Sequence, residues 1–137
     1  MAGTQILFLS VLICVLSIAL AMGGRQERIA AVAMGLAAVA SPLVQDPAFV
    51  GLNIGLLVVD FALLVVLGWL VFASDRYWPM FAAGFHLTGT MVHSFPGLMA
   101  RLHPDAYADA IAVWAYPVLL SLLAGTLLEA RTVKGPA

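Results

Sequence analysis

Residues 51–99 read GLNIGLLVVDFALLVVLGWLVFASDRYWPMFAAGFHLTGTMVHSFPGLM, and this stretch decides the fold. Two long apolar runs lie on either side of the short polar segment SDRY at residues 74–77. At about 1.5 Å of rise per residue, each run is long enough to cross the hydrocarbon core of a bilayer, so the stretch predicts a transmembrane helical hairpin. Asp60 lies near the middle of the first run, and His86 and His93 lie in the second.

The composition of the whole chain indicates the same surroundings. Of its 137 residues, 64% are hydrophobic and 9% are charged, and the mean hydropathy is +1.07. A soluble domain is typically about 25% charged, and a soluble fold of this length could not bury so much apolar surface. The sequence therefore predicts a protein whose main partner is the lipid bilayer. The net charge of −1 offers no basic surface for nucleic acid.

The remaining apolar runs extend this prediction to an all-α fold, an integral membrane bundle of five transmembrane helices in a single domain over residues 1–137. The second helix is short for a bilayer of about 30 Å unless Glu27 and Arg28 add an interfacial turn. No basic residue precedes the first helix, so we expect it to be retained rather than cleaved as a signal peptide, with Cys14 as a small buried side chain. The predicted helices cover about residues 4–22, 29–44, 49–73, 78–99 and 107–128.

Small residues mark faces suited to close helix packing. Ala33, Ala37 and Ser41 recur every four residues in the second predicted helix, and Gly51 and Gly55 form a GxxxG pattern in the third. Small side chains let membrane helices approach closely where no hydrophobic effect drives their pairing. These faces favour contacts with neighbouring helices or with other membrane chains.

The basic residues predict the orientation of the bundle. With five helices, alternate connections share a side, and the positive-inside rule places the more basic side in the cytoplasm and the N-terminus outside. Five of the six Lys and Arg residues fall on that side: Arg25, Arg28, Arg76, Arg131 and Lys134. Aromatic residues are expected to anchor the same interface, and these are Trp69, Tyr77 and Trp78.

The depth of Asp60 in the bilayer indicates which histidine of the hairpin is its partner. A charged carboxylate at mid-bilayer costs about 2.5–3.5 kcal/mol on insertion scales, so Asp60 should face protein or water. If the two helices are antiparallel about the SDRY turn, Asp60 lies level with about residue 92, and His86 lies level with about residue 66. We therefore expect Asp60 and His93 to form an intramembrane polar pair through a hydrogen bond or an ion pair.

A seam of polar and small residues surrounds this pair. His86, Gly89 and Thr90 share one side of the fourth predicted helix, and Asn53 shares the face of Asp60 on the third. Three interpretations stay open. The seam is a place where helices pack together, a proton or quinone site that uses His and Asp as a relay, or a site of haem or metal ligation.

Helical geometry restrains the last interpretation. His86 and His93 are seven residues apart on one helix, about 10.5 Å along its axis, so they cannot supply both axial ligands of one iron or share one metal ion. We predict no metal site and no cofactor, with haem or quinone as the alternative. Tyr107, Trp114 and Tyr116 are expected to anchor an interface, with a lipid or quinone pocket as the alternative.

Three stretches of the chain carry a resemblance. They are SDRYWP at residues 74–79, the stripe at residues 82–93, and the turn WAYP at residues 114–117. In these stretches the chain resembles uncharacterised small polytopic proteins of the bacterial inner membrane, which form no named family. The resemblance implies a location in the bacterial inner (plasma) membrane and implies no activity.

The sequence predicts no enzymatic activity, because it has no phosphate-binding glycine loop, no nucleophilic serine elbow, no paired carboxylates and no CxxC pair. The chain is small and its predicted loops are too short to build a site outside the membrane. We predict an accessory or structural subunit that packs against other membrane chains in a homo- or hetero-oligomer. The alternatives are a membrane anchor subunit of a redox complex that contributes to a haem or quinone site, and a small oligomeric channel or carrier with Asp60 on its path.

Overall fold

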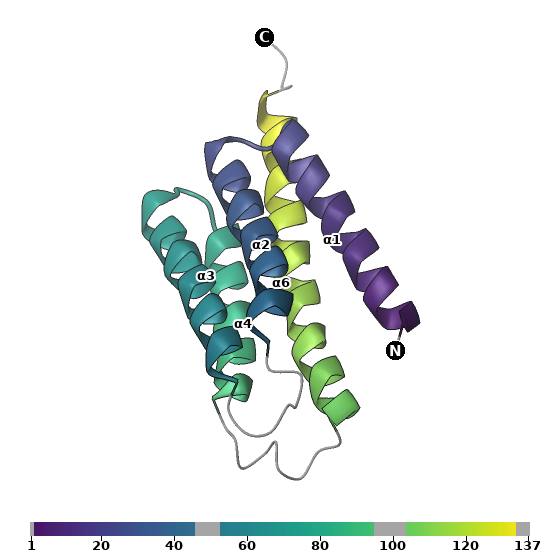
Figure 1. Ribbon diagram of the computed structural model, residues 1–137. Helices are drawn as coiled ribbons and strands as arrows, with labels where there is room; N and C mark the ends of the chain where they lie inside the picture. Colours follow the sequence, from purple (N-terminus) through teal and green to yellow (C-terminus); the bar gives the residue numbers. More distant parts are fainter. Residues whose placement is uncertain (1, 46–52, 95–103, 134–137) are drawn as a thin grey trace.

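The computed structural model describes residues 2–45, 53–94 and 104–133, and over these residues the chain forms five α-helices and no strand (Figure 1). The prediction of an all-α fold is confirmed. The helices are α1 (Ala2–Met22), α2 (Arg25–Val44), α3 (Ile54–Ala73), α4 (Trp78–His93) and α6 (Pro104–Val133).

Four of these helices are long and apolar enough to cross a membrane. The fifth, α4, has 16 residues, which is about 24 Å of helix and less than the hydrocarbon core of about 30 Å. The described chain is thus a helical bundle with four candidate membrane spans and one shorter helix. The spans are Thr4–Met22, Arg25–Val44, Ile54–Ala73 and Val113–Arg131.

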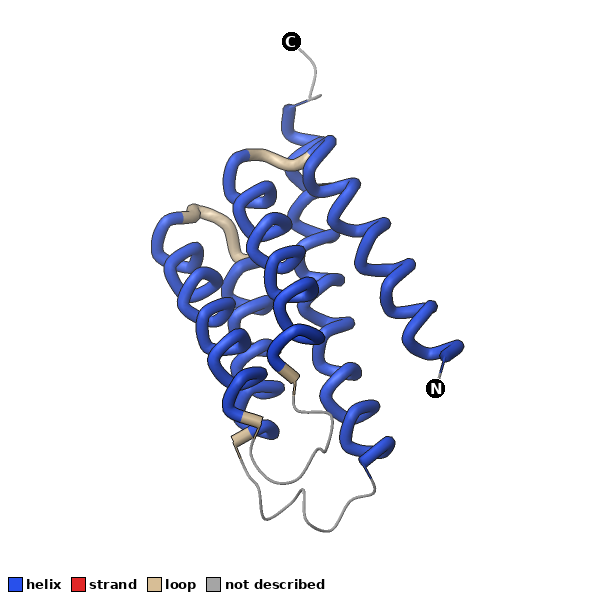
Figure 2. Tube along the Cα trace, viewed as in Figure 1, coloured by secondary structure: helices blue, strands red, loops and turns tan. Residues whose placement is uncertain are grey.

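The helices run alternately up and down (Figures 1 and 2). Their contacts form a ring in which α1 packs on α2, α2 on α3, α3 on α4, α4 on α6 and α6 on α1, and α2 also contacts α6 inside the ring. The connections at residues 23–24 and 74–77 and the C-terminal end of α6 lie at one end of the bundle, which we name the connection end. The basic residues described at this end are Arg25, Arg28, Arg76 and Arg131.

The first turn of α2 is the polar run RQER at residues 25–28, so the helix begins before the predicted residue 29. The N–H of Gly23 donates to the carbonyl oxygen of Ala19 at 3.0 Å, and a Cβ on Gly23 would lie 2.6 Å from the Cβ of Glu27. Glycine is therefore required where α1 turns into α2. The early start gives α2 20 residues and a length of about 30 Å, which removes the apparent shortness of this helix.

The connection at residues 74–77 changes the register of the hairpin. Ser74 is extended, with φ −118° and ψ 137°, and the connection descends beside the last turn of α3 before α4 begins (Figure 2). A symmetric turn would start α4 level with the end of α3. Because α4 starts lower, each of its residues lies closer to the N-terminus of α3 than the sequence predicts.

The far end of α4 lies at His93. The N–H of Ser94 donates to the carbonyl oxygen of Met91 at 3.0 Å, which closes the last turn tightly. Pro96 has no backbone N–H with which to continue the helical hydrogen bonds. The predicted extension over residues 95–99 lies outside the described residues.

The predicted boundaries of α3 and α6 also differ from the structure. The described part of α3 begins at Ile54, and the predicted start at residues 49–52 lies outside the described residues. Helix α6 extends its predicted range at both ends and continues through Pro117. The predicted helix over residues 107–128 lies wholly within α6, and it includes Pro117 as predicted. The carbonyl oxygen of Pro117 accepts a hydrogen bond from Oγ of Ser121 at 2.8 Å.

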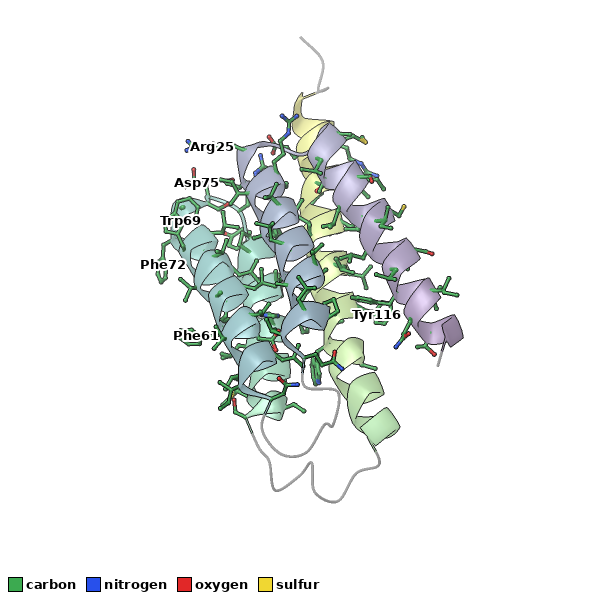
Figure 3. All side chains as sticks on the ribbon, viewed as in Figure 1. Arg25, Phe61, Trp69, Phe72, Asp75 and Tyr116 are labelled. Carbon is green, nitrogen blue, oxygen red and sulfur yellow. The ribbon has the colours of Figure 1, made fainter. Side chains whose placement is uncertain are left out.

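Buried apolar side chains from all five helices form one core. Its members are Leu12, Val15, Ala19, Ala30, Ala31, Met34, Leu67, Leu70, Trp78, Ala82, Val118, Leu119 and Leu122. Trp78, predicted at an interface, is only 6% exposed, whereas Tyr77 is 78% exposed. Cys14, expected to be buried, is exposed on α1. Phe61, Trp69 and Phe72 point away from the bundle along α3, as side chains that contact lipid would (Figure 3).

The contact between Gly125 of α6 and the indole of Trp78 predicts a packing defect in Gly125→Ala. A Cβ at this position would overlap the ring, so we expect the variant to be destabilised by about 1–3 kcal/mol, measured as thermal unfolding in detergent by circular dichroism. Gly84→Ala is the matched control, because no atom lies within 4 Å of its added Cβ. Equal unfolding midpoints for the two variants would contradict this packing.

Candidate functional site

A buried carboxylate lies at the connection end. Glu27, in the first turn of α2, is only 1% exposed, and its Oε1 accepts a hydrogen bond from Nε1 of Trp78 at 2.8 Å. A buried indole N–H needs an acceptor and a buried carboxylate needs donors, so one contact serves both groups. Trp78 is the first residue of α4, and α2 and α4 are not neighbours in the ring. The bond therefore crosses the bundle.

Three further contacts fasten the connection end. Nε2 of Gln26 donates to the carbonyl oxygen of Ala73 at 2.9 Å, and Oε1 of the same amide accepts from Oγ of Ser74 at 3.1 Å. Arg76 forms an ion pair with Glu129 of α6. The connection between α3 and α4 is thereby tied to α2 on one side and to α6 on the other.

Glu27 and Glu129 approach each other across a recess of about 310 Å³ at this end. A Cβ on Gly24 would lie 3.1 Å from Oε2 of Glu27 and 3.5 Å from Oε1 of Glu129. The Arg76 guanidinium on Glu129 offsets the repulsion between these carboxylates. The sequence offers Glu27 as part of an interfacial turn of the second helix, which the structure confirms, but it does not predict the burial of Glu27 or its bond to Trp78. The available signal was an acidic residue close to a predicted helix start, together with an indole N–H that needs an acceptor.

A second site is a cavity of about 470 Å³ inside the bundle, toward the end away from the connections. All five helices contribute to its wall, and its size lies in the range of small-molecule sites. Most of the wall is apolar. Among the described residues of the wall, the ionisable side chains are Asp60 and His86, and the other polar side chains are Gln5, Ser41 and Gln45.

His86 is held at this cavity by the backbone of α3. Its Nε2 donates to the carbonyl oxygen of Asp60 at 2.9 Å, and because a carbonyl oxygen only accepts, Nε2 carries the proton. In the neutral ring Nδ1 is then an acceptor. The predicted level of His86, near residue 66, is corrected by this contact, since α4 starts below the end of α3. The side chain of His93 lies outside the described residues, so its pairing with Asp60 stays a prediction.

Gly89 and Thr90 of the predicted seam lie where α4 meets other elements. A Cβ on Gly89 would lie 3.1 Å from the Cβ of Trp114, so this glycine permits a close approach of α4 and α6. Thr90 is buried, and its Oγ1 donates to the carbonyl oxygen of His86 at 2.9 Å. Trp114, which was expected from the sequence to anchor an interface, thus packs beside α4 in the structure.

Three other residues singled out in the sequence have local roles. Oδ1 of Asn53 accepts a hydrogen bond from the N–H of Leu56 at 3.4 Å, so Asn53 caps the start of α3 rather than sharing a helical face with Asp60. Oγ of Ser41 donates to the carbonyl oxygen of Ala37 at 2.8 Å. Ala37 and Ser41 both line the cavity, so this part of the small-residue face borders open space.

Helix α1 diverges from the bundle toward its N-terminus (Figure 1). Its N-terminal half forms one wall of the cavity. Gln5 and Leu9 of α1 are both exposed and both line the cavity. Tyr116 of α6 points toward α1 and meets Phe8 edge to face, with ring centroids 5.8 Å apart and an interplanar angle of 84° (Figure 3). Such an aromatic pair typically contributes about 0.5–1.5 kcal/mol of stability in addition to the burial of its surface. The contact holds α1 beside the cavity. The side chain of Tyr107 lies outside the described residues.

The cavity suits a mostly apolar ligand with one or two hydrogen-bonding groups. Within the described part of the chain, no three His, Cys, Asp or Glu side chains gather as a metal site would need. No protein-family model, no curated protein and no solved structure matches the chain. The features of the described chain that bear on its function are therefore the cavity and the contacts at the connection end.

The bond across the bundle predicts that Trp78→Phe is destabilising. The variant keeps an aromatic ring but removes the N–H that Glu27 accepts, and leaving a buried acceptor without its donor costs about 1–3 kcal/mol. The measurement is the unfolding midpoint in detergent by circular dichroism. Trp69→Phe makes the same change at a tryptophan that is 53% exposed, and its effect should stay within about 0.5 kcal/mol. Identical midpoints for both variants would exclude a stabilising role for the bond.

Proposed function

We propose that the protein is a non-enzymatic integral membrane protein, an accessory or structural subunit that packs against other membrane chains. The observation that carries this proposal is the use of the polar side chains at the connection end. Glu27 bonds to Trp78 and Arg76 pairs with Glu129, so these groups join helices to one another. The two described connections have two and four residues, which leaves little chain there for a site outside the bundle.

The apolar outer surface supports the same proposal. Large hydrophobic side chains are exposed on every described helix, and this surface suits lipid or the helices of a partner. In the proposed arrangement all five helices cross the bacterial inner membrane. The connection end, with its four described arginines, faces the cytoplasm, and the N-terminus lies outside.

Photo-crosslinking from four exposed positions tests the packing role. A photoreactive residue is placed at Ile13, Val39, Val58 or Leu120, each between 62% and 66% exposed and each on a different helix. We expect one face to give a protein adduct of constant mass in native membranes, and the opposite face to label lipid alone. Adducts at multiples of 14.4 kDa would identify a homo-oligomer, which the channel or carrier alternative also requires. Lipid labelling from all four positions would refute the accessory role.

The cavity favours a second candidate function, the membrane anchor subunit of a redox complex that contributes to a quinone site. Nδ1 of His86 is an acceptor suited to a hydroquinone hydroxyl, Asp60 lines the same space, and the apolar wall suits a ring and an isoprenoid tail. His86 is the one imidazole that the described wall contributes, and this fits a quinone better than a haem with two histidine ligands.

Binding of a short-chain benzoquinone tests this second function. At a concentration of 100 Kd, a ligand of the folded state stabilises it by about 2.7 kcal/mol, which appears as a rise in the unfolding midpoint. Ala37→Leu places a larger side chain on the cavity wall and should abolish the rise. Gly84→Leu adds an apolar side chain at a position with open space around it and should keep the rise. No rise in the unsubstituted protein, or an equal rise in both variants, would exclude the quinone site.

A further inference from the structure

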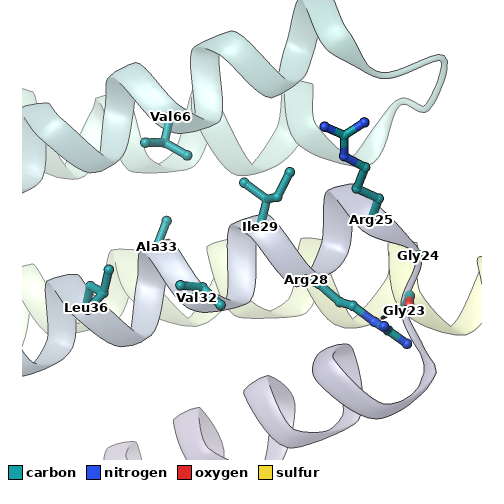
Figure 4. Close-up of a pocket in the computed structure, with 9 residues that line it drawn as sticks. All are labelled: Gly23, Gly24, Arg25, Arg28, Ile29, Val32, Ala33, Leu36 and Val66. Atoms are coloured by element: carbon teal, nitrogen blue, oxygen red, sulfur yellow. Dashed lines mark hydrogen bonds between the residues drawn. The ribbon is translucent and has the colours of Figure 1, made fainter.

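A groove of about 760 Å³ runs along α2 and has two arginines at its connection end (Figure 4). Its apolar wall includes Val32 and Leu36 of α2 and Val66 of α3. Arg25 and Arg28 lie at the end where α1 turns into α2. The groove is separate from the cavity that holds Asp60 and His86.

The two guanidinium groups flank the mouth of the groove. Arg25 is directed toward α3 and Arg28 toward α1 (Figure 4). Nε of Arg28 donates to the carbonyl oxygen of Gly23 at 3.1 Å, which fixes the side chain while its two terminal nitrogens remain available. Glu27, which stands between them in sequence, is turned into the bundle and is 1% exposed. The exposed Asp75 shares an adjoining recess with Arg25, and the mouth keeps a net positive charge.

The length of the groove matches one leaflet of a bilayer. From Gly24 to Leu36 the helix rises about 18 Å, and half of a hydrocarbon core of about 30 Å is about 15 Å. The charged mouth then lies at the depth of lipid headgroups, and the apolar wall lies at the depth of acyl chains. Basic pockets between transmembrane helices on the cytoplasmic side suit anionic headgroups, because arginine forms charge-assisted hydrogen bonds with phosphate oxygens.

We propose that this groove binds an anionic phospholipid of the leaflet at the connection end. The phosphate lies at the mouth of the groove that Arg25 and Arg28 flank, and one acyl chain runs along Val32 and Leu36 toward the bilayer centre. A zwitterionic phospholipid fills the apolar groove equally well but brings a positive group to a mouth that is already positive. The site goes beyond the packing role of the protein and does not depend on it.

Native mass spectrometry in detergent tests the headgroup. Phosphatidylglycerol or phosphatidylcholine with the same acyl chains is added at increasing concentration, and the dissociation constant of the first bound lipid is measured. We expect tighter binding of phosphatidylglycerol, and a loss of about 30-fold in the double variant Arg25→Gln, Arg28→Gln. Arg131→Gln, at an exposed arginine of the same end that does not line the groove, should change the affinity less than twofold. Equal binding of both lipids, or equal losses in the double variant and in R131Q, overturns the proposal.

A second pair of variants tests the acyl chain. Val32→Trp fills the apolar part of the groove and should weaken phosphatidylglycerol binding at least tenfold. Val39→Trp makes the same change at an exposed position of α2 that does not line the groove, and it should have no effect. In native membranes, a photoreactive residue at Val32 should label phospholipid. Labelling of a polypeptide there, or equal binding by V32W and V39W, assigns the groove to another occupant and overturns the proposal.

Discussion

The hydrogen bond from Nε1 of Trp78 to the carboxylate of Glu27 sets the arrangement of the bundle, because it joins two helices that are not neighbours. Each polar atom lies in the first turn of its helix, so the bond fixes where both helices start. Gly125 leaves room for the indole against α6. Arg76 and Glu129 then tie the connection between α3 and α4 to α6. Where water is excluded, each such group needs a partner within the protein. Among the described residues, most polar side-chain contacts between helices lie at the connection end.

The sequence predicts the helices well where composition alone decides them. The apolar runs of α1 and α3 end at Gly23 and at the SDRY segment, and the structure ends them there too. It leaves the start of α2 open, because the charged residues 25–28 suit either a loop or the interfacial turn that the structure shows. Whether such a run is a loop or a helical turn depends on Trp78, a partner 51 residues away in the chain. Burial of Glu27 is therefore a tertiary property, and so is the burial of Trp78 away from the interface.

The candidate site could be predicted in part for a related reason. Asp60 and His86 stand out in the sequence because ionisable residues are rare in apolar runs, and the structure brings both to one cavity. Their mutual level could not be predicted, because it depends on the conformation of residues 74–77, and one helical turn shifts a side chain by about 5.4 Å. The cavity itself depends on the divergence of α1 and on the contact of Phe8 with Tyr116, neither of which has a local sequence signal.

The shortness of α4 has a consequence for the surrounding lipid. Its 16 residues present about 24 Å of helix, while the 20 residues of α3 beside it present about 30 Å. Met80, Phe81, Leu87 and Met91 of α4 are exposed, so in the proposed membrane arrangement this flank of the bundle is open to acyl chains. A bilayer that contacts both α3 and α4 has to become thinner beside α4. The cost is fractions of a kcal/mol per Å of difference between the helix length and the bilayer thickness. In the proposed arrangement the bundle matches two thicknesses at once, and the acyl-chain length of the host membrane then helps to determine where the protein is most stable.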